Sequence, residues 1–82
     1  MKILPLHSGI REYLKKHKLE AKFEKQEKFF EKNPFYSSLQ IELLEPRKMR
    51  IWSFRINGKY RAIFIFRRKN TIEIIDINNH YK

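Results

Sequence analysis

Residues 51–77, IWSFRINGKYRAIFIFRRKNTIEIIDI, decide the fold. β-branched and aromatic residues dominate this stretch, and such side chains suit the pleated, half-buried surface of a β-sheet. Turn signals at Asn57-Gly58 and at Lys69-Asn70 divide it into segments. We expect strands at Ile51 to Ile56, Tyr60 to Arg67 and Thr71 to Ile77. The stretch therefore predicts an antiparallel meander.

The register of the first hairpin follows from which side chains must share a face. Asn-Gly favours a two-residue loop, but that loop would place Arg55 and Arg61 on opposite faces of the sheet. A three-residue loop, Asn57 to Lys59, leaves both arginines on one face. The other face then gathers the apolar side chains Trp52, Phe54, Ile56, Tyr60, Ala62 and Phe64. We prefer this register, because a slip of one residue would move every core side chain into water, and we interpret these aromatic residues as core rather than as a surface for stacking bases.

The chain before the meander has the spacing of helices. Apolar residues such as Leu19, Phe23 and Phe30 recur on one helical stripe among Lys and Glu, and Asn33-Pro34 ends the pattern. The further elements that we expect are a strand at Lys2 to Leu6, a helix capped by His7 or Ser8 that ends near His17-Lys18, a helix at about Leu19 to Lys32, and a strand at about Leu39 to Leu43.

Together these elements predict an α+β fold, with two N-terminal helices packed on one face of a twisted, mainly antiparallel β-sheet. A chain of 82 residues is too short for two ordinary domains, so residues 1–82 are expected to form a single domain. Cysteine is absent, which excludes a disulfide framework and thiolate metal sites. No apolar run approaches the roughly 18 residues of a membrane helix, and we expect a cytoplasmic protein.

The charge of the chain indicates a polyanionic partner. Nineteen Lys and Arg against nine Asp and Glu give a net charge of +10. Nucleic acid, an anionic membrane surface and an acidic protein segment all fit this charge. The membrane surface fits least well, because neither helix places bulky apolar residues opposite a purely basic face.

Three segments carry a resemblance to a known family. Residues 52–64, WSFRINGKYRAIF, resemble the central hairpin of the RelE/ParE toxin superfamily. Residues 76–82, DINNHYK, resemble the last strand and tail of its YoeB-like branch of mRNA interferases, which ends in a His-Tyr pair. Asn33-Pro34-Phe35, followed by Leu39 and Leu43-Leu44, resembles the helix exit and first long strand. The likeness is weak over residues 1–32 and strong from Asn33 onward.

The resemblance implies the toxin of a type II toxin–antitoxin pair, with a basic cleft on the open face of the sheet and a cognate antitoxin as partner. In the YoeB-like branch the toxin acts with the ribosome as an endoribonuclease and cleaves mRNA. The ribose 2′-hydroxyl attacks the adjacent phosphate without a metal or other cofactor. Two alternatives stay open: a ParE-like toxin that inhibits gyrase, and a basic RNA-binding module without catalytic activity.

The same resemblance implies catalytic roles, since this cleavage needs a base, cations for the charge on phosphate, and an acid. Glu42 falls where the branch carries its catalytic glutamate, although Glu45 is an alternative. Arg61 matches the arginine of the family hairpin and can bind a phosphate through two hydrogen bonds; its alternative role is an ion pair with Glu42 or Asp76. The set is completed by the terminal pair His80 and Tyr81.

Further cations are expected to bind RNA. Arg55 would provide a second phosphate contact in the preferred register. The basic stretch before the central strand contributes Arg47, Lys48 and Arg50, although a solvated turn would have the same composition. His7 and His17 are interpreted as helix-cap or surface residues.

Overall fold

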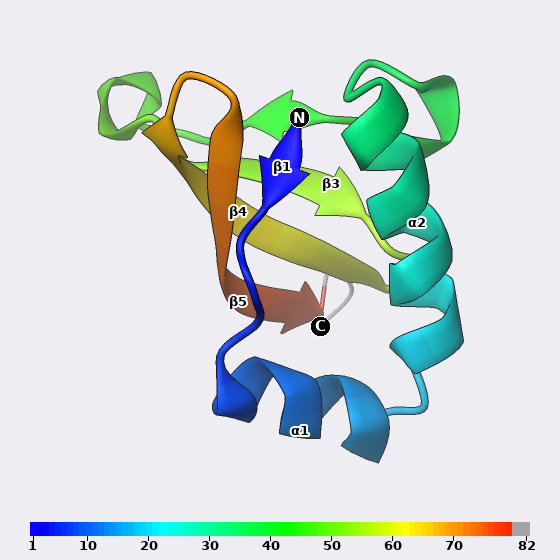
Figure 1. The fold of residues 1–82 in the computed structure, drawn as a ribbon. Coiled ribbons are helices and arrows are strands. Elements are labelled where there is room, and N and C mark those ends of the chain that lie inside the picture. The colour runs from blue at the N-terminus through cyan, green and yellow to red at the C-terminus, as the bar shows by residue number, and fades with distance from the viewer. Residues whose placement is uncertain (80–82) are drawn as a thin grey trace.

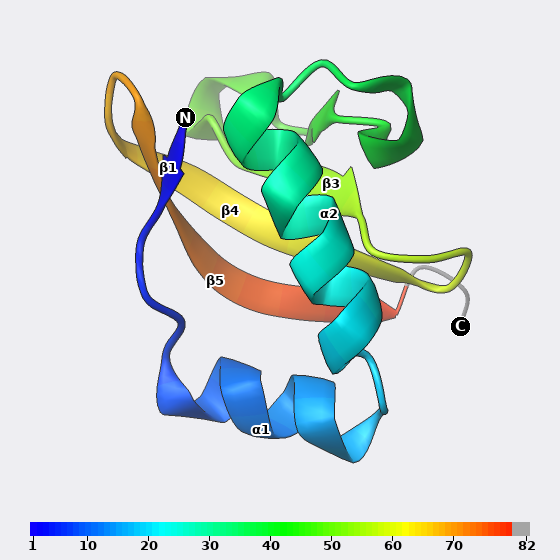
Figure 2. The same cartoon turned by 45° about the vertical axis from the view of Figure 1, so that its right-hand side comes forward.

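The computed structural model describes residues 1–79, in which a five-stranded sheet in the order β1-β5-β4-β3-β2 packs against two helices (Figures 1 and 2). β1 runs parallel to β5, and the other neighbouring strands are antiparallel. The elements are β1 (Lys2–Ile3), α1 (Ser8–Lys16), α2 (Glu20–Lys32), the 3-10 helix η1 (Ser37–Leu39), β2 (Glu42–Leu43), the 3-10 helix η2 (Arg47–Met49), β3 (Trp52–Arg55), β4 (Tyr60–Arg68) and β5 (Thr71–Asn79). The expected fold class is confirmed. Neither helix of the described residues has the length and apolarity needed to cross a membrane.

The β3–β4 hairpin has the register of the three-residue loop. Arg55 lies opposite Arg61, and Phe54 lies opposite Ala62. The Asn57 side chain shapes the loop, because its Oδ1 accepts hydrogen bonds from the backbone N–H groups of Lys59 at 2.8 Å and Tyr60 at 2.9 Å. The preference for the register that collects apolar side chains on one face is therefore confirmed.

The core lies between α2 and the sheet. Phe30 from the helix meets Phe54 and Phe64 from the sheet, with ring centroids 5.4 and 5.3 Å apart, and none of the three is exposed. Pairs of aromatic rings at such distances attract one another beyond the burial of their surface. The interpretation of the hairpin aromatics as core is confirmed for Phe54 and Phe64, and Trp52 and Tyr60 are partly buried against this core.

One polar residue, Gln26, is buried on the apolar stripe of α2. Its amide nitrogen donates to the carbonyl oxygens of Arg55 at 2.6 Å and Ser38 at 3.2 Å, and its amide oxygen accepts from the Ser38 hydroxyl at 3.3 Å. A buried polar group without partners costs about 1–3 kcal/mol, and here each polar atom of the side chain has one. Gln26 thus ties α2 to η1 and to the end of β3.

The prediction of a strand at Leu39 to Leu43 is wrong for most of these residues. Leu39 ends the 3-10 helix η1 and is fully buried, and Gln40 has a left-handed φ of 43°. Only Glu42 and Leu43 pair with β3. An apolar residue that fills the core from a 3-10 turn has the same local pattern as the start of a buried strand. The strand expected at Lys2 to Leu6 is likewise shorter and covers Lys2–Ile3 alone.

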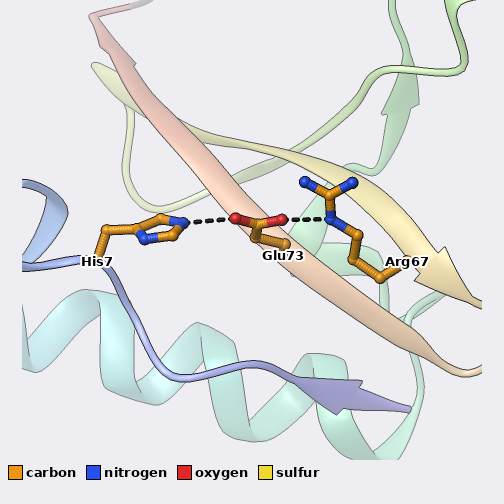
Figure 3. A network of polar contacts seen from close by, with 3 residues as sticks. All are labelled: His7, Arg67 and Glu73. Atoms are coloured by element: carbon orange, nitrogen blue, oxygen red, sulfur yellow. Dashed lines mark hydrogen bonds and ion pairs between the residues drawn. The ribbon is translucent and has the colours of Figure 1, made fainter.

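A polar network attaches the start of α1 to the β4–β5 hairpin (Figure 3). Glu73 on β5 accepts hydrogen bonds from His7 Nε2 through one carboxylate oxygen and from Arg67 Nε through the other, each at 2.5 Å. His7 is the N-cap residue of α1 but makes no side-chain cap bond there, because its ring is directed to Glu73. The hydrogen bonds from His7 and then Arg67 lower the pKa of Glu73 below its ordinary value of 4.5.

Glu73→Gln is expected to destabilise the protein at neutral pH and to lose this effect in acid. Because the folded-state pKa of Glu73 is lowered, the unfolded chain binds the proton more readily, and the carboxylate stabilises the fold above pH 4.5. That contribution disappears as the pH falls through the folded-state pKa, which lies below 4.5. Urea unfolding of the unchanged protein and of Glu73→Gln, from about pH 7 to about pH 3, measures the difference in their free energies of unfolding. The exposed Glu12→Gln is the control, and a pH-independent difference for Glu73→Gln would contradict the network.

Phe30→Ala is expected to lower the free energy of unfolding by about 3–5 kcal/mol, because it opens a cavity in the core. Phe35→Ala removes the same ring from a side chain that is 80% exposed and should change it by no more than about 0.5 kcal/mol. Urea unfolding measures both variants, and equal effects would refute the described core.

Candidate functional site

The face of the sheet opposite the helices is polar near the β3–β4 loop. Side chains alternate between the two faces of a strand. Phe54 and Ala62 belong to the core on the helix side, so their neighbours Ser53, Arg55 and Arg61 lie on the opposite face. Glu42 on β2 pairs with Ser53, and Asn78 on β5 pairs with Arg61. Four adjacent strands therefore contribute polar side chains to this open face.

Arg61 is the most constrained side chain of the open face. It is 7% exposed, its Nε donates to Ser53 Oγ at 2.8 Å, and its Nη2 donates to the carbonyl oxygen of Gln40. Burial lowers the pKa of the guanidinium, the Glu42 carboxylate acts in the opposite direction, and Arg55 lowers it further. An arginine stays charged even so, and the side chain is a fixed cation that reaches from β4 across β3.

Glu42 lies beside this cation. Its Oε2 is 3.9 Å from Arg61 Nη2, and its side chain is 53% exposed. The structure thus brings together two of the residues expected to be catalytic. The same distance also fits the alternative role of Arg61, which is an ion pair with Glu42. Glu45, the other candidate for the carboxylate, instead pairs with Arg47 at 3.3 Å.

Arg55 is directly opposite Arg61 and half-buried. It makes no ion pair within residues 1–79, so two guanidinium groups face one another across neighbouring strands with one nearby carboxylate. Like charges opposite one another destabilise a sheet. An anion bound between them would relieve this repulsion.

The terminal pair His80 and Tyr81 lies outside the described residues. The described part of β5 ends with Asn78 opposite Arg61 and Asn79 opposite Tyr60. The strand therefore leads the chain to the end of the sheet at which Arg61 lies, and the catalytic roles of the terminal pair stay predictions.

The basic stretch lies at the other end of β3. Arg47 and Lys48 are in η2, and Arg50, with a left-handed φ of 54°, follows it. The Arg50 guanidinium carbon is 5.5 Å from the centre of the Trp52 ring, a cation–π geometry. The structure consequently separates these cations from Arg55 by the length of β3.

Sequence reasoning missed an aromatic cluster beside the end of β5. The His17 ring lies 4.1 Å from that of Tyr13 and 5.6 Å from that of Tyr60, which pairs with Asn79. Burial raises the pKa of Tyr13, and the neighbouring Tyr60 and Asp76 raise it further. His17 is the C-cap residue of α1, as the helix-cap interpretation expects, but its ring contacts had no sequence signal.

This arrangement of helices and strands is the fold of the YoeB and ParE toxins. The structure matches a YoeB/ParE toxin from Agrobacterium tumefaciens with a TM-score of 0.70 and 19% identity, over 99% of this chain and 100% of that one. It also matches YoeB–YefM complexes from Staphylococcus aureus at 22% identity: a heterotetrameric toxin–antitoxin complex with a TM-score of 0.68, covering 98% of this chain and 94% of that one, and a second complex with 0.69, covering 99% and 98%. No protein-family model and no curated protein matches the sequence. The expected resemblance is confirmed at the level of the fold.

Arg61→Lys is expected to destabilise the protein by about 1–3 kcal/mol, because an ammonium group cannot replace the guanidinium contacts to both Ser53 and Gln40. Arg55→Lys keeps the same charge at the facing position and should change stability by no more than about 0.5 kcal/mol. Chemical unfolding of the two variants measures the difference. Equal stabilities would show that Arg61 does not hold the edge of the sheet.

Proposed function

We propose that this chain is the toxin of a type II toxin–antitoxin pair and acts as a ribosome-dependent endoribonuclease on mRNA. The observation that supports it best is the facing pair Arg55 and Arg61 with Glu42 at its side. Two guanidinium groups bind the oxygens of a phosphodiester, and the carboxylate is suited to accept a proton. The fold shared with the YoeB toxins supports the same assignment.

The proposed reaction uses the RNA itself as the nucleophile. Glu42 accepts the proton of a ribose 2′-hydroxyl, whose oxygen attacks the adjacent phosphorus. The bond from phosphorus to the 5′-oxygen of the next nucleotide breaks, and that oxygen takes a proton from an acid, the role expected of His80. The products are a 2′,3′-cyclic phosphate and a 5′-hydroxyl. In the proposed step side chains supply the base and the acid, without a metal.

The two arginines would have different roles in this reaction. Arg61 is held by Ser53 and Gln40 before RNA arrives, and a preorganised cation stabilises developing charge without reorganising. Arg55 is more exposed and has no carboxylate partner among the described residues, so it is free to follow the phosphate. Tyr81 is proposed to stack on a base or position the phosphate.

The proposed partners are the ribosome, mRNA and a cognate antitoxin. YoeB is bound to the antitoxin YefM in the matched Staphylococcus aureus complexes. An acidic segment of such a partner would complement the net charge of +10. Gyrase inhibition is the second candidate, because the matched Agrobacterium tumefaciens protein is described as a YoeB/ParE toxin.

Glu42→Gln is expected to reduce message cleavage by about 10²- to 10⁴-fold, the usual contribution of general acid–base catalysis. Mapping the 5′-ends of messages after induced expression measures the cleavage, and circular dichroism checks folding. Glu45→Gln is the matched control and should cleave like the unchanged protein.

Undiminished cleavage by Glu42→Gln would remove Glu42 from the mechanism. Intact messages together with a DNA-damage response, after expression of the unchanged protein, would favour gyrase inhibition. Intact messages with harmless expression would favour the non-catalytic RNA-binding module.

A further inference from the structure

A hollow of about 350 Å³ lies beside the open face, between α2, η1 and the end of β3. β2 pairs only with the first half of β3, so the edge at Arg55 carries no further strand. The hollow occupies the space at this free edge. Its lining residues are Lys22, Lys25, Gln26, Phe29, Tyr36, Ser38, Arg55, Ile56 and Asn57.

The charged residues that line the hollow are all cations. Lys22 and Lys25 come from successive turns of α2, and Arg55 comes from β3. None of the three forms an ion pair within residues 1–79, in contrast to Lys28 on the same helix, which pairs with Glu24 at 3.6 Å. The positive potential of the hollow is therefore left uncompensated by the described side chains.

An aromatic pair forms another part of the lining. The rings of Phe29 and Tyr36 are stacked, with centroids 4.3 Å apart and planes inclined by 19°. Tyr36 is 43% exposed. A flat, partly exposed ring is a surface on which a nucleic-acid base can stack, with a contribution of about 1–3 kcal/mol.

Gln26 fixes the shape of the hollow by joining the elements that line it. Its three hydrogen bonds hold Ser38 and the backbone of Arg55 against α2. With its polar atoms already engaged, Gln26 is a positioning residue rather than a ligand. The cations and the aromatic pair are thus presented on a preformed surface, which lowers the entropic cost of binding.

We propose that this hollow binds one nucleotide of single-stranded RNA, next to the phosphodiester that the toxin cleaves. Lys22 and Lys25 contact its phosphate and Tyr36 stacks on its base. Arg55 belongs both to the hollow and to the pair with Arg61, so it connects the two sites. The proposal rests on the proposed function for its ligand, RNA.

An acidic peptide is the competing ligand. The carboxylates of such a peptide would pair with Lys22 and Lys25, but an acidic peptide carries no flat group that must stack on the Tyr36 ring. A nucleotide combines an anionic phosphate with a flat aromatic base, and it therefore matches both parts of the lining. We infer RNA rather than a protein segment for this reason.

The test measures the affinity of the folded chain for a labelled 2′-O-methyl RNA octamer by fluorescence anisotropy. The 2′-O-methyl group blocks the attacking oxygen, so binding is observed without cleavage. Lys22→Ala/Lys25→Ala is expected to weaken binding at least tenfold and to make the salt dependence shallower by roughly 0.7 per lost phosphate contact. Tyr36→Ala should weaken RNA binding roughly tenfold, whereas Tyr36→Phe, which keeps the ring, should bind like the unchanged protein.

Lys2→Ala/Lys69→Ala is the matched control, because it removes the same charge at the opposite end of the sheet, beside the β4–β5 turn. The control should bind nearly as the unchanged protein does. If the hollow variants bind RNA like this control, the proposal is overturned. If they lose affinity for an acidic peptide and not for RNA, it is also overturned, and the hollow belongs to a protein partner.

Binding and cleavage are separable in this design. Weaker RNA binding by the hollow variants supports the hollow even when the unchanged protein leaves messages intact, in which case only the nuclease assignment fails. Unchanged RNA binding by these variants overturns the hollow even when Glu42→Gln abolishes cleavage, in which case the nuclease assignment stands.

Discussion

The buried guanidinium of Arg61 is the interaction on which the open face depends. A cation that is only 7% exposed needs oxygen partners in fixed positions. Ser53 supplies a hydroxyl from β3, and Gln40 supplies a carbonyl from the chain that enters β2. Gln40 takes a left-handed φ of 43° at this point, and the chain then delivers Glu42 beside the guanidinium. One charged group thus couples the edge of the sheet to the position of the carboxylate.

The hairpin could be predicted because its sequence contains the deciding information. Alternation along β3 and β4 leaves one register in which Phe54 and Phe64 share a buried face, and that register also places Arg55 opposite Arg61. The path from η1 to β2 could not be predicted in the same way. Leu39 fills the core from a 3-10 turn, and the choice between that turn and a strand is made by distant packing partners.

The site was predictable only where it follows the strands. The choice of Glu42 over Glu45 as the neighbour of Arg61 depends on the pairing of β2, which is two residues long. The hollow depends on η1 folding back so that Tyr36 meets Phe29. In the sequence its lysines resemble any solvated helix face. The one usable signal was Gln26, a polar residue at a position where the apolar stripe of α2 requires burial.

The same electrostatics that indicate an anionic ligand also connect binding to stability. Arg55 and Arg61 repel one another across the strands. The net charge of +10 adds a repulsion among all the cations, which opposes the folding of a chain with a small core. A ligand that binds the folded state alone raises the free energy of unfolding in proportion to the logarithm of its concentration. An anion placed at Arg55 removes repulsion from the hollow and from the arginine pair at once, because this residue belongs to both. An anionic ligand bound at Arg55 would therefore stabilise the folded state through both sites.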